Sequence, residues 1–262
     1  MSEKTVCTIR DLNWSYRNKE LFKHLDASFP ADKFISIIGP NGSGKTTLLR
    51  HLLRLLPAPR NSIILAGEDL QDYSQRALAR HVSYVPQQSR IEYDFTVYEC
   101  VAMGRYSHGT RLSMLGPEDH RIISSSLEAM ELGHLSERAA TELSGGEYQR
   151  MLIARALAQQ SSVILLDEPV SHLDVHSQRE ILSLLRNLVD QGTATVLCVL
   201  HDLNAVSAYS DLVLMMQSGA IVAEGTVREV LTKQRIEEVY HVEVQVLTSD
   251  DEGPPVILPR WR

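Results

Sequence analysis

The feature that most constrains this chain is a glycine-rich turn at residues 39–46, Gly-Pro-Asn-Gly-Ser-Gly-Lys-Thr. It fits the pattern G-x-x-x-x-G-K-[ST], in which small residues let several backbone N–H groups converge on phosphate oxygens. A short apolar run at 34–38 precedes the turn, and leucines at helical spacing follow it over 46–56. Strand, glycine turn and helix in that order predict a phosphate-binding loop at a helix N-terminus.

Two side chains of this loop carry specific expectations. Lys45 is expected to reach the β- and γ-phosphates of a nucleotide, and the Thr46 hydroxyl to bind Mg²⁺. The predicted nucleotide contacts are Gly39, Pro40, Asn41, Gly42, Ser43, Gly44, Lys45, Thr46 and Thr47. Such a loop occurs in kinases, GTPases, helicases and transporters, so by itself it indicates only a nucleotide.

Composition excludes some classes of protein. The net charge of the 262 residues is −7 and no stretch gathers Lys and Arg, which argues against a nucleic-acid partner. The three cysteines are far apart in the sequence, which favours a reducing compartment over a disulfide framework or a zinc site. No signal peptide is evident, and every apolar run is far shorter than the ~20 residues that span a bilayer. Any membrane role is therefore expected to act through a partner.

Strand and helix patterns alternate along the chain. Residues 5–16 and 21–29 alternate apolar and polar side chains, as half-buried antiparallel strands do. The remaining pattern predicts an α/β core with a mostly parallel sheet. Further strands are expected at 34–38, 62–65, 82–86, 163–166, 194–200 and 212–216, with helices near 74–80, within 87–160 and over 175–189. Pro117 marks a helix start within the helical stretch.

The last part of the chain has its own local signals. Ser218 and Gly219 predict a hairpin turn, and Thr226 with Glu229 predicts a capping box at a helix start. The acidic stretch 249–255, rich in Gly and Pro, is interpreted as a mobile loop.

A second candidate site lies where the apolar strand 163–166 ends in two carboxylates. Asp167 can hold Mg²⁺ through water, and Glu168 can then polarise an attacking water as a general base. The plainer alternative is a buried strand that merely ends in polar residues.

A third motif, Leu-Ser-Gly-Gly-Glu at residues 143–147, opens a helical run that continues to residue 160. It forms a second anion-binding helix N-terminus, this time without a lysine. Two phosphate-binding turns in one chain suggest that each serves a different nucleotide or that two chains share one. An ordinary helix cap is the alternative.

These motifs, in this order and spacing, resemble the ABC ATPases, whose signature motif reads LSGGE or LSGGQ. The resemblance runs from about residue 4 to residue 247. It implies an α/β fold with a P-loop NTPase (RecA-like) core, an N-terminal antiparallel β subdomain and an inserted α-helical signature subdomain. It also implies one domain over 1–262, with the core at 1–86 and 161–225, the helical subdomain at 87–160 and a small C-terminal extension at 226–262.

The resemblance assigns roles to further residues. Tyr16 stands where the family places an aromatic ring against adenine, with Trp14 as the alternative. Gln87 resembles the glutamine that touches Mg²⁺ and the attacking water, with Gln88 as the alternative. His201 resembles the switch histidine that contacts the γ-phosphate.

The resemblance also implies that two copies of the chain bind two ATP at their interface. The residues expected to act on the nucleotide of the other copy are Ser144, Gly145, Gly146, Glu147 and Asp174, the last from the family's D-loop at 171–174. Val170 and Tyr148 depart mildly from the family pattern, without removing a group that contacts phosphate or metal.

One segment narrows the family further. Residues 101–106, followed by 116–120, resemble the ATPases of importers for vitamin B12, ferric siderophores and haem, although a generic helical subdomain is an alternative. The implied partners are a second copy of the chain, integral-membrane permease subunits and, indirectly, a substrate-binding protein. The implied location is peripheral, at the cytoplasmic face of the inner membrane. A soluble ABC ATPase, such as one that assists iron–sulfur cluster assembly, and a pure binding module remain as alternatives.

Overall fold

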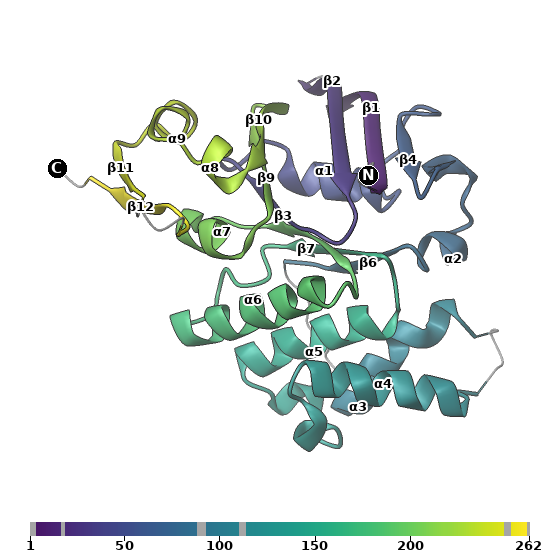
Figure 1. Ribbon diagram of the computed structural model, residues 1–262. Helices are drawn as coiled ribbons and strands as arrows, with labels where there is room; N and C mark the ends of the chain where they lie inside the picture. The colour runs from purple at the N-terminus through teal and green to yellow at the C-terminus, as the bar shows by residue number, and fades with distance from the viewer. Residues whose placement is uncertain (1–3, 17–18, 88–92, 110–113, 249–252, 261–262) are drawn as a thin grey trace. The chain divides into compact units, whose positions relative to one another are not determined.

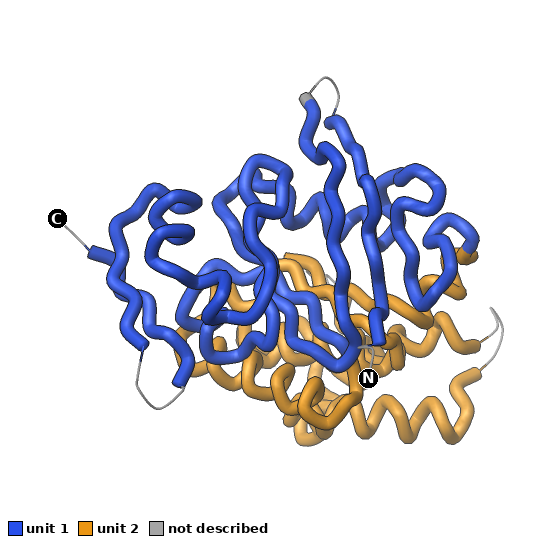
Figure 2. The backbone as a smooth tube through the Cα atoms, turned by 45° about the horizontal axis from the view of Figure 1, so that its top comes forward, with its two compact units in different colours: residues 1–72, 195–262 blue, residues 73–194 orange. Residues whose placement is uncertain are grey.

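The computed structural model describes residues 4–16, 19–87, 93–109, 114–248 and 253–260. The chain forms two compact units, which Figure 2 distinguishes by colour. The first unit comprises residues 1–72 and 195–262, and the second comprises residues 73–194. The division predicted from the sequence, with a helical subdomain at 87–160, comes from the family resemblance and not from compact packing. It stays a prediction.

The first unit contains an antiparallel sheet in the order β2-β1-β4-β5. Its two long strands, β1 (Thr5–Tyr16) and β2 (Lys19–Pro30), pair antiparallel, and β1 also pairs with β4 (Ile63–Leu65), which is followed by β5 (Glu68–Asp69). Apolar side chains that alternate along β1 and β2, such as Ile9, Phe22 and Phe29, are almost completely buried. The antiparallel strands expected from the alternation are therefore confirmed (Figure 1).

The same unit contains a second group of strands, in the order β10-β9-β3-β8. Strands β3 (Phe34–Ile38), β8 (Thr195–Val199) and β9 (Leu212–Gln217) run parallel, whereas β10 (Ala220–Thr226) returns antiparallel to β9. Every residue of β3 and β8 is buried, as expected for parallel strands covered on both faces. The hairpin predicted at Ser218 and Gly219 is confirmed, and both residues have positive φ.

Helix α1 (Lys45–Leu52) follows the glycine turn after β3. The helix expected to continue to residue 56 is wrong at its end, because Arg54 has a φ of 52°. A left-handed residue ends a helix, and Pro57 further disfavours helical backbone at the residue before it.

The C-terminal part of the first unit is more ordered than the sequence indicated. It contains α7 (Leu203–Tyr209), α8 (Val227–Val230), α9 (Lys233–Tyr240) and a hairpin of β11 (Val244–Leu247) and β12 (Val256–Pro259). The predicted capping box of Thr226 and Glu229 is confirmed. Residues 249–252 of the expected loop lie outside the described residues. The carbonyls of Gly253 and Pro255 accept hydrogen bonds from Arg228 and Ser207, so this end of the stretch is packed.

The second unit combines a pair of parallel strands with helices. Strands β6 (Val82–Val85) and β7 (Val163–Asp167) run parallel, so their carboxyl ends lie at the same edge. Helix α2 (Gln75–Leu78) precedes β6, and α6 (Val175–Asp190) follows β7. Between the strands lie α3 (Val97–Ala102), the 3₁₀ helix η2 (Met103–Ser107), α4 (Pro117–Ala129) and α5 (Gly145–Ala158).

Helices α3, α4 and α5 pack against one another, as Figure 1 shows. Their starts follow local chemistry, since Thr96 and Glu99 form a capping box before α3 and Pro117 is the first residue of α4. Large apolar side chains such as Ile123 and Met151 are fully buried, and each such side chain contributes about 1.5–3 kcal/mol to folding.

Candidate functional site

The phosphate loop, residues 39–46, has a backbone that only glycine can adopt at two points. Gly39 has a φ of 144°, and a Cβ there would lie 2.1 Å from the Met216 carbonyl oxygen. Gly44 has a φ of 107°, and a Cβ there would lie 2.7 Å from Cε1 of Phe22. Both positions combine a left-handed backbone with close packing against strands β9 and β2 of the same unit, so neither accepts a side chain without strain.

Lys45 lies folded into the phosphate loop. Its side chain is buried, and its ammonium donates to the carbonyls of Gly39 (2.8 Å) and Pro40 (3.1 Å). The hydroxyl of Ser43 is also buried, and no residue in the described part of the chain hydrogen bonds to it. Thr46 and Thr47 are half-buried in the first turn of α1. A fixed cation, an unpartnered hydroxyl and a helix N-terminus together suit a phosphate group.

The second group of predicted residues lies at the carboxyl ends of β6 and β7. Asp167 is buried at the end of β7 and accepts a long hydrogen bond (3.4 Å) from the hydroxyl of Tyr84. The Gln87 side chain, two residues beyond β6, donates from Nε2 to Oε2 of Glu168 at 2.6 Å. Because β6 and β7 are parallel neighbours, the fold brings together residues that are 81 positions apart in sequence.

Glu168 also has an unusual backbone, with a φ of 52°. A residue other than glycine in this region is strained by about 1–3 kcal/mol, and such strain concentrates at functional sites. The conformation turns the chain sharply after a buried strand and presents the half-buried carboxylate to Gln87. The alternative glutamine, Gln88, lies outside the described residues.

The signature turn, residues 143–147, begins helix α5 with a capping box. Ser144 donates from its backbone N–H (2.8 Å) and from its hydroxyl (2.7 Å) to Oε2 of Glu147. The hydrogen bonds from the Ser144 hydroxyl and backbone hold the pKa of Glu147 below its usual range, so the helix start carries its own anion.

The start of α6 packs directly behind the signature turn. Asp174 caps α6 by accepting from the backbone (3.0 Å) and the hydroxyl (2.9 Å) of Ser177. These bonds lower the pKa of Asp174. A Cβ on Gly146 would lie 3.0 Å from the Ser177 hydroxyl oxygen, and Arg150 forms an ion pair with Glu180 at 2.9 Å. The second unit therefore brings the signature turn and the predicted D-loop residue to neighbouring helix starts.

The two aromatic candidates near the end of β1 differ in their surroundings. The ring of Trp14 is half-buried and packs edge-on against the buried ring of His51, with 4.9 Å between centroids. Tyr16 is 61% exposed and its ring is accessible for stacking. His201 is exposed two residues after the end of β8. Tyr16, the phosphate loop and His201 all belong to the first unit.

Sequence reasoning missed three residues that contact these groups. Tyr84 bonds Asp167, and Ser177 lies against Gly146. The phenol of Tyr240, in α9, lies near the backbone of Gly39, and burial raises the pKa of Tyr240 to about 12. No local pattern marks Ser177 or Tyr240. Only Tyr84 had a usable signal, as a polar aromatic in a strand beside the carboxylate pair.

Comparison with known proteins identifies the family. The ABC transporter family model matches residues 22–171. The chain is 35% identical to the ferric enterobactin transport ATP-binding protein FepC of Escherichia coli K12, over 96% of this chain and 93% of that protein. It is 34% identical to the iron(3+)-hydroxamate import ATP-binding protein FhuC of Bacillus subtilis, over 94% and 92% respectively. It is also 34% identical to the hemin import ATP-binding protein HmuV of Escherichia coli O157:H7, over 97% and 99%.

Solved structures agree in fold. An inward-facing metal-chelate type ABC transporter superposes with a TM-score of 0.85, at 28% identity and over 98% of both chains. The bacterial ABC transporter cassette MJ0796, solved as a dimer, superposes with a TM-score of 0.73, at 25% identity, over 85% of this chain and 99% of that chain. The P-loop core, the antiparallel β subdomain and the helical insert expected from the sequence are those of this family. The chain belongs to the ABC transporter family, as one of its ATP-binding ATPase subunits.

Proposed function

We propose that two copies of this ATPase bind and hydrolyse ATP at a shared interface and thereby drive a membrane permease that imports a metal chelate. The observation that carries the catalytic part is the group of Gln87, Asp167 and Glu168 at the ends of β6 and β7. Among the described residues, this group places a candidate general base next to a candidate metal ligand.

Each predicted residue has a distinct task in this proposal. Lys45 and the backbone N–H groups of the phosphate loop bind the β- and γ-phosphates. Glu168 accepts a proton from the attacking water, and Gln87, already hydrogen bonded to Glu168, orients that water. His201 contacts the γ-phosphate, and Tyr16 stacks on adenine. Positioning and charge stabilisation then supply most of the rate enhancement.

The donor atoms present fit Mg²⁺ as the cofactor. The candidate ligands are the Thr46 hydroxyl, the Asp167 carboxylate and the Gln87 amide, all oxygen donors of the kind that this hard cation prefers. No group of three or more His, Cys, Asp or Glu in the described part of the chain could hold a metal ion. The three donors of Thr46, Asp167 and Gln87 suit a cation that is bound mainly by substrate phosphates. When bound with ATP, Mg²⁺ would neutralise charge that develops on the phosphates.

A second copy of the chain accounts for the signature turn. The turn contains no lysine, and its carboxylate, Glu147, already occupies the helix start, so it is a weak anion site on its own. An ATP held by another copy's phosphate loop would supply the missing binding energy. The resemblance to MJ0796, a cassette solved as a dimer, supports this arrangement of Ser144, Gly146 and Asp174 in trans.

The permease and its cargo are proposed from the relatives. FepC, FhuC and HmuV are named for the transport of ferric enterobactin, iron hydroxamate and hemin, and the superposed transporter is of metal-chelate type. We therefore propose an iron–siderophore, haem or cobalamin importer, with a substrate-binding protein as an indirect partner. No helix within the described residues is long and apolar enough to cross a membrane. The proposed location is peripheral, on the cytoplasmic face of the inner membrane, through the permease.

Substitution Glu168→Gln tests the catalytic assignment. The amide keeps the shape but accepts no proton, so kcat should fall by about 100- to 1000-fold while the dissociation constant for ATP stays within a few-fold. Glu128→Gln, an exposed glutamate on α4, is the matched control and should retain the original kcat. Phosphate release measured at saturating ATP decides the matter, and an unchanged kcat for Glu168→Gln would reject the general-base role.

The same variant tests the partner. Purified from its native membranes with ATP, Glu168→Gln should retain a companion chain with many membrane spans, since ATP that is not hydrolysed keeps the paired state. Companions that are all soluble would instead favour a cytosolic ABC ATPase, such as one that assists iron–sulfur cluster assembly.

A further inference from the structure

The segment that follows α3, residues 103–108, packs closely against the C-terminal end of the signature helix α5. At Gly104 the two backbones approach so closely that a Cβ would lie 2.3 Å from the carbonyl oxygen of Arg155. Four residues later, Nε2 of His108 lies 2.8 Å from the carbonyl oxygen of Gln159, the C-cap of α5. The 3₁₀ helix η2 is therefore fitted along the last turn of α5 by backbone contact as well as by side chains.

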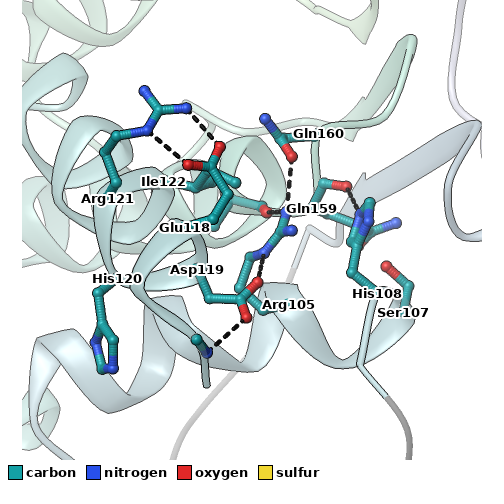
Figure 3. Close-up of polar contacts among 12 residues, drawn as sticks. Arg105, Ser107, His108, Glu118, Asp119, His120, Arg121, Ile122, Gln159 and Gln160 are labelled. Carbon is teal, nitrogen blue, oxygen red and sulfur yellow. Dashed lines mark hydrogen bonds and ion pairs between the residues drawn. The ribbon is translucent and has the colours of Figure 1, made fainter. Parts of the chain in front are cut away.

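Arg105 is the centre of this contact, and Figure 3 shows its guanidinium between three segments. Its side chain is only 5% exposed. Nη1 donates to the carbonyl oxygen of Ala158 (2.8 Å) and to Oε1 of Gln160 (2.9 Å), while Nε donates to Oδ1 of Asp119 (2.8 Å). One planar group thus joins η2, the start of α4 and the end of α5, a geometry that the single ammonium of lysine cannot reproduce.

The charges of this cluster complement one another. The hydrogen bond from Arg105, followed by that from the Gly116 backbone, lowers the pKa of Asp119, so the carboxylate is ionised at neutral pH and pairs with the arginine. The arginine in turn donates to a carbonyl at the C-terminus of α5, where the helix dipole favours a cation. The ion pair therefore links the N-terminus of one helix to the C-terminus of another.

An ion pair of this kind contributes little net stability, because the buried arginine loses its hydration, whereas Asp119 remains 24% exposed. The ion pair instead fixes the orientation of the segments that it joins, since the planar guanidinium fork donates hydrogen bonds only in set directions. Helix α5 has 14 residues, which corresponds to roughly 21 Å, and its other end is the signature turn. A small rotation of α5 about its anchored end would displace Ser144 and Gly146 at the far end.

We propose that Arg105 is a positioning residue for ATP hydrolysis. By fixing the C-terminal end of α5 it sets the direction in which the signature turn is presented to the nucleotide of a second copy. This inference rests on the proposed function, in which Ser144 and Gly146 act in trans. The guanidinium of Arg105 is buried and its donors are directed at Asp119, Ala158 and Gln160, so its replacement should impair pairing of the two copies and spare ATP binding by each one.

The test compares Arg105→Lys with Arg121→Lys in the full-length chain. Arg121 is the matched control, because it also pairs with a carboxylate of α4, Glu118, but both side chains are about two-thirds exposed. Three quantities are measured for each variant: the dissociation constant for ATP, the ATP-dependent dimerisation constant in the Glu168→Gln background, and the ATPase rate as a function of protein concentration. Protein concentrations are corrected for the fraction that binds ATP.

We expect Arg105→Lys to keep its dissociation constant for ATP within about twofold and to weaken ATP-driven dimerisation by about tenfold. The ATPase rate should rise to its plateau only at about tenfold higher protein concentration, whereas Arg121→Lys should match the original chain. A merely structural role would lower the melting temperature and the active fraction without moving the dimerisation constant, and that result would overturn the proposal.

If Arg105→Lys does not fold, Asp119→Asn provides the same test with a smaller change. It removes the charge partner but leaves the two bonds from Arg105 to the end of α5, so we expect a weakening of dimerisation by about threefold. A dimerisation constant equal to that of the original chain would again overturn the proposal. A parent chain that stays monomeric with ATP would instead reject the proposed function, and the role of Arg105 with it.

Discussion

The chain contains two glycine turns that open helices, and they are built in opposite ways. In the phosphate loop, Gly39 and Gly44 take left-handed backbone conformations under tight packing, and a buried lysine lies within the loop. In the signature turn, Gly145 and Gly146 begin an ordinary helix, and a glutamate of that helix occupies its start. The first turn is preorganised to bind an anion. In the second turn, the positive end of the helix dipole is already neutralised by the Glu147 carboxylate. This fits a site that contacts phosphate only after another copy of the chain has bound the ATP.

The comparison makes Lys45→Ala the most damaging change to nucleotide binding. Removing a buried charge-assisted contact to phosphate should weaken ATP affinity by roughly 100-fold, near 3 kcal/mol. Titration of the isolated chain with ATP measures it, with the exposed Lys23→Ala as control. A dissociation constant that stays at the original value would mean that the two turns are equivalent anion sites and that the comparison is wrong.

Ser144→Arg should show the reverse pattern. The large cation displaces the capping hydroxyl and fills the exposed helix start, so ATP-driven dimerisation should weaken by at least about 50-fold. Binding of ATP to the monomer should stay within about twofold. Analytical ultracentrifugation in the Glu168→Gln background measures the dimer, and a dimer that forms normally would exclude the shared site.

The substitutions Gly44→Ala and Gly145→Ala compare the two turns by the free energy of unfolding that each variant loses. At Gly44 the methyl group meets the Phe22 ring in a left-handed backbone, which should lower the free energy of unfolding by about 2–3 kcal/mol. At Gly145 the backbone is helical and the methyl group would lie 3.3 Å from a Leu173 methyl group, so the change should stay within about 1 kcal/mol. Urea unfolding of the two variants provides the measurement, and equal losses would contradict the difference in backbone constraint.

The helices after the two turns also differ, since only α1 buries a histidine. Burial lowers the pKa of His51 to about 4, and among the described residues neither ring nitrogen has a hydrogen-bond partner. Between about pH 6.5 and pH 4 the unfolded chain binds a proton that the folded chain does not. Stability is therefore lost as the pH falls through this window, by about 1–2 kcal/mol, which is less than the full shift because local opening lets water reach the ring.

Replacing His51 by leucine isolates this effect. The variant should unfold with a flatter pH dependence than the original chain between pH 6.5 and pH 4, and its stability at pH 7.5 should change little because no hydrogen bond is broken. Denaturant unfolding at several pH values measures both. A pH slope identical to that of the original chain would show that His51 titrates normally in the fold.

The candidate site shows which local structures could be predicted from the sequence. The glycine turn before α1, the carboxylates at the end of β7 and the start of α5 were recognisable because each depends on a few consecutive residues. Resemblance favoured Tyr16 over Trp14 by position alone, because both are aromatic and two residues apart. Packing distinguishes them, since Trp14 lies on His51 while Tyr16 is exposed. Their roles toward ATP stay predictions.

Helices α3, η2 and α4 show a contact that could not be predicted from the sequence. The run around Gly104 and Arg105 was recognised as a family pattern, without a chemical reason for the arginine. The reason involves Asp119, 14 residues away, and the carbonyl of Ala158, 53 residues away, which only folding brings to one guanidinium. A charged residue in a helical pattern is ordinarily assigned to the surface, so its burial was not predictable from periodicity.

The sequence by itself determined most strands and helices up to residue 216, the capping box of Thr226 and Glu229 and the glycine turn that opens α1, because these depend on side chains within a few residues of one another. Only the tertiary structure decided that Gln87 reaches Glu168 and that Arg105 anchors α5. These depend on which distant segments pack together. Buried area and paired charge determine that packing, and neither is a property of any short stretch of sequence.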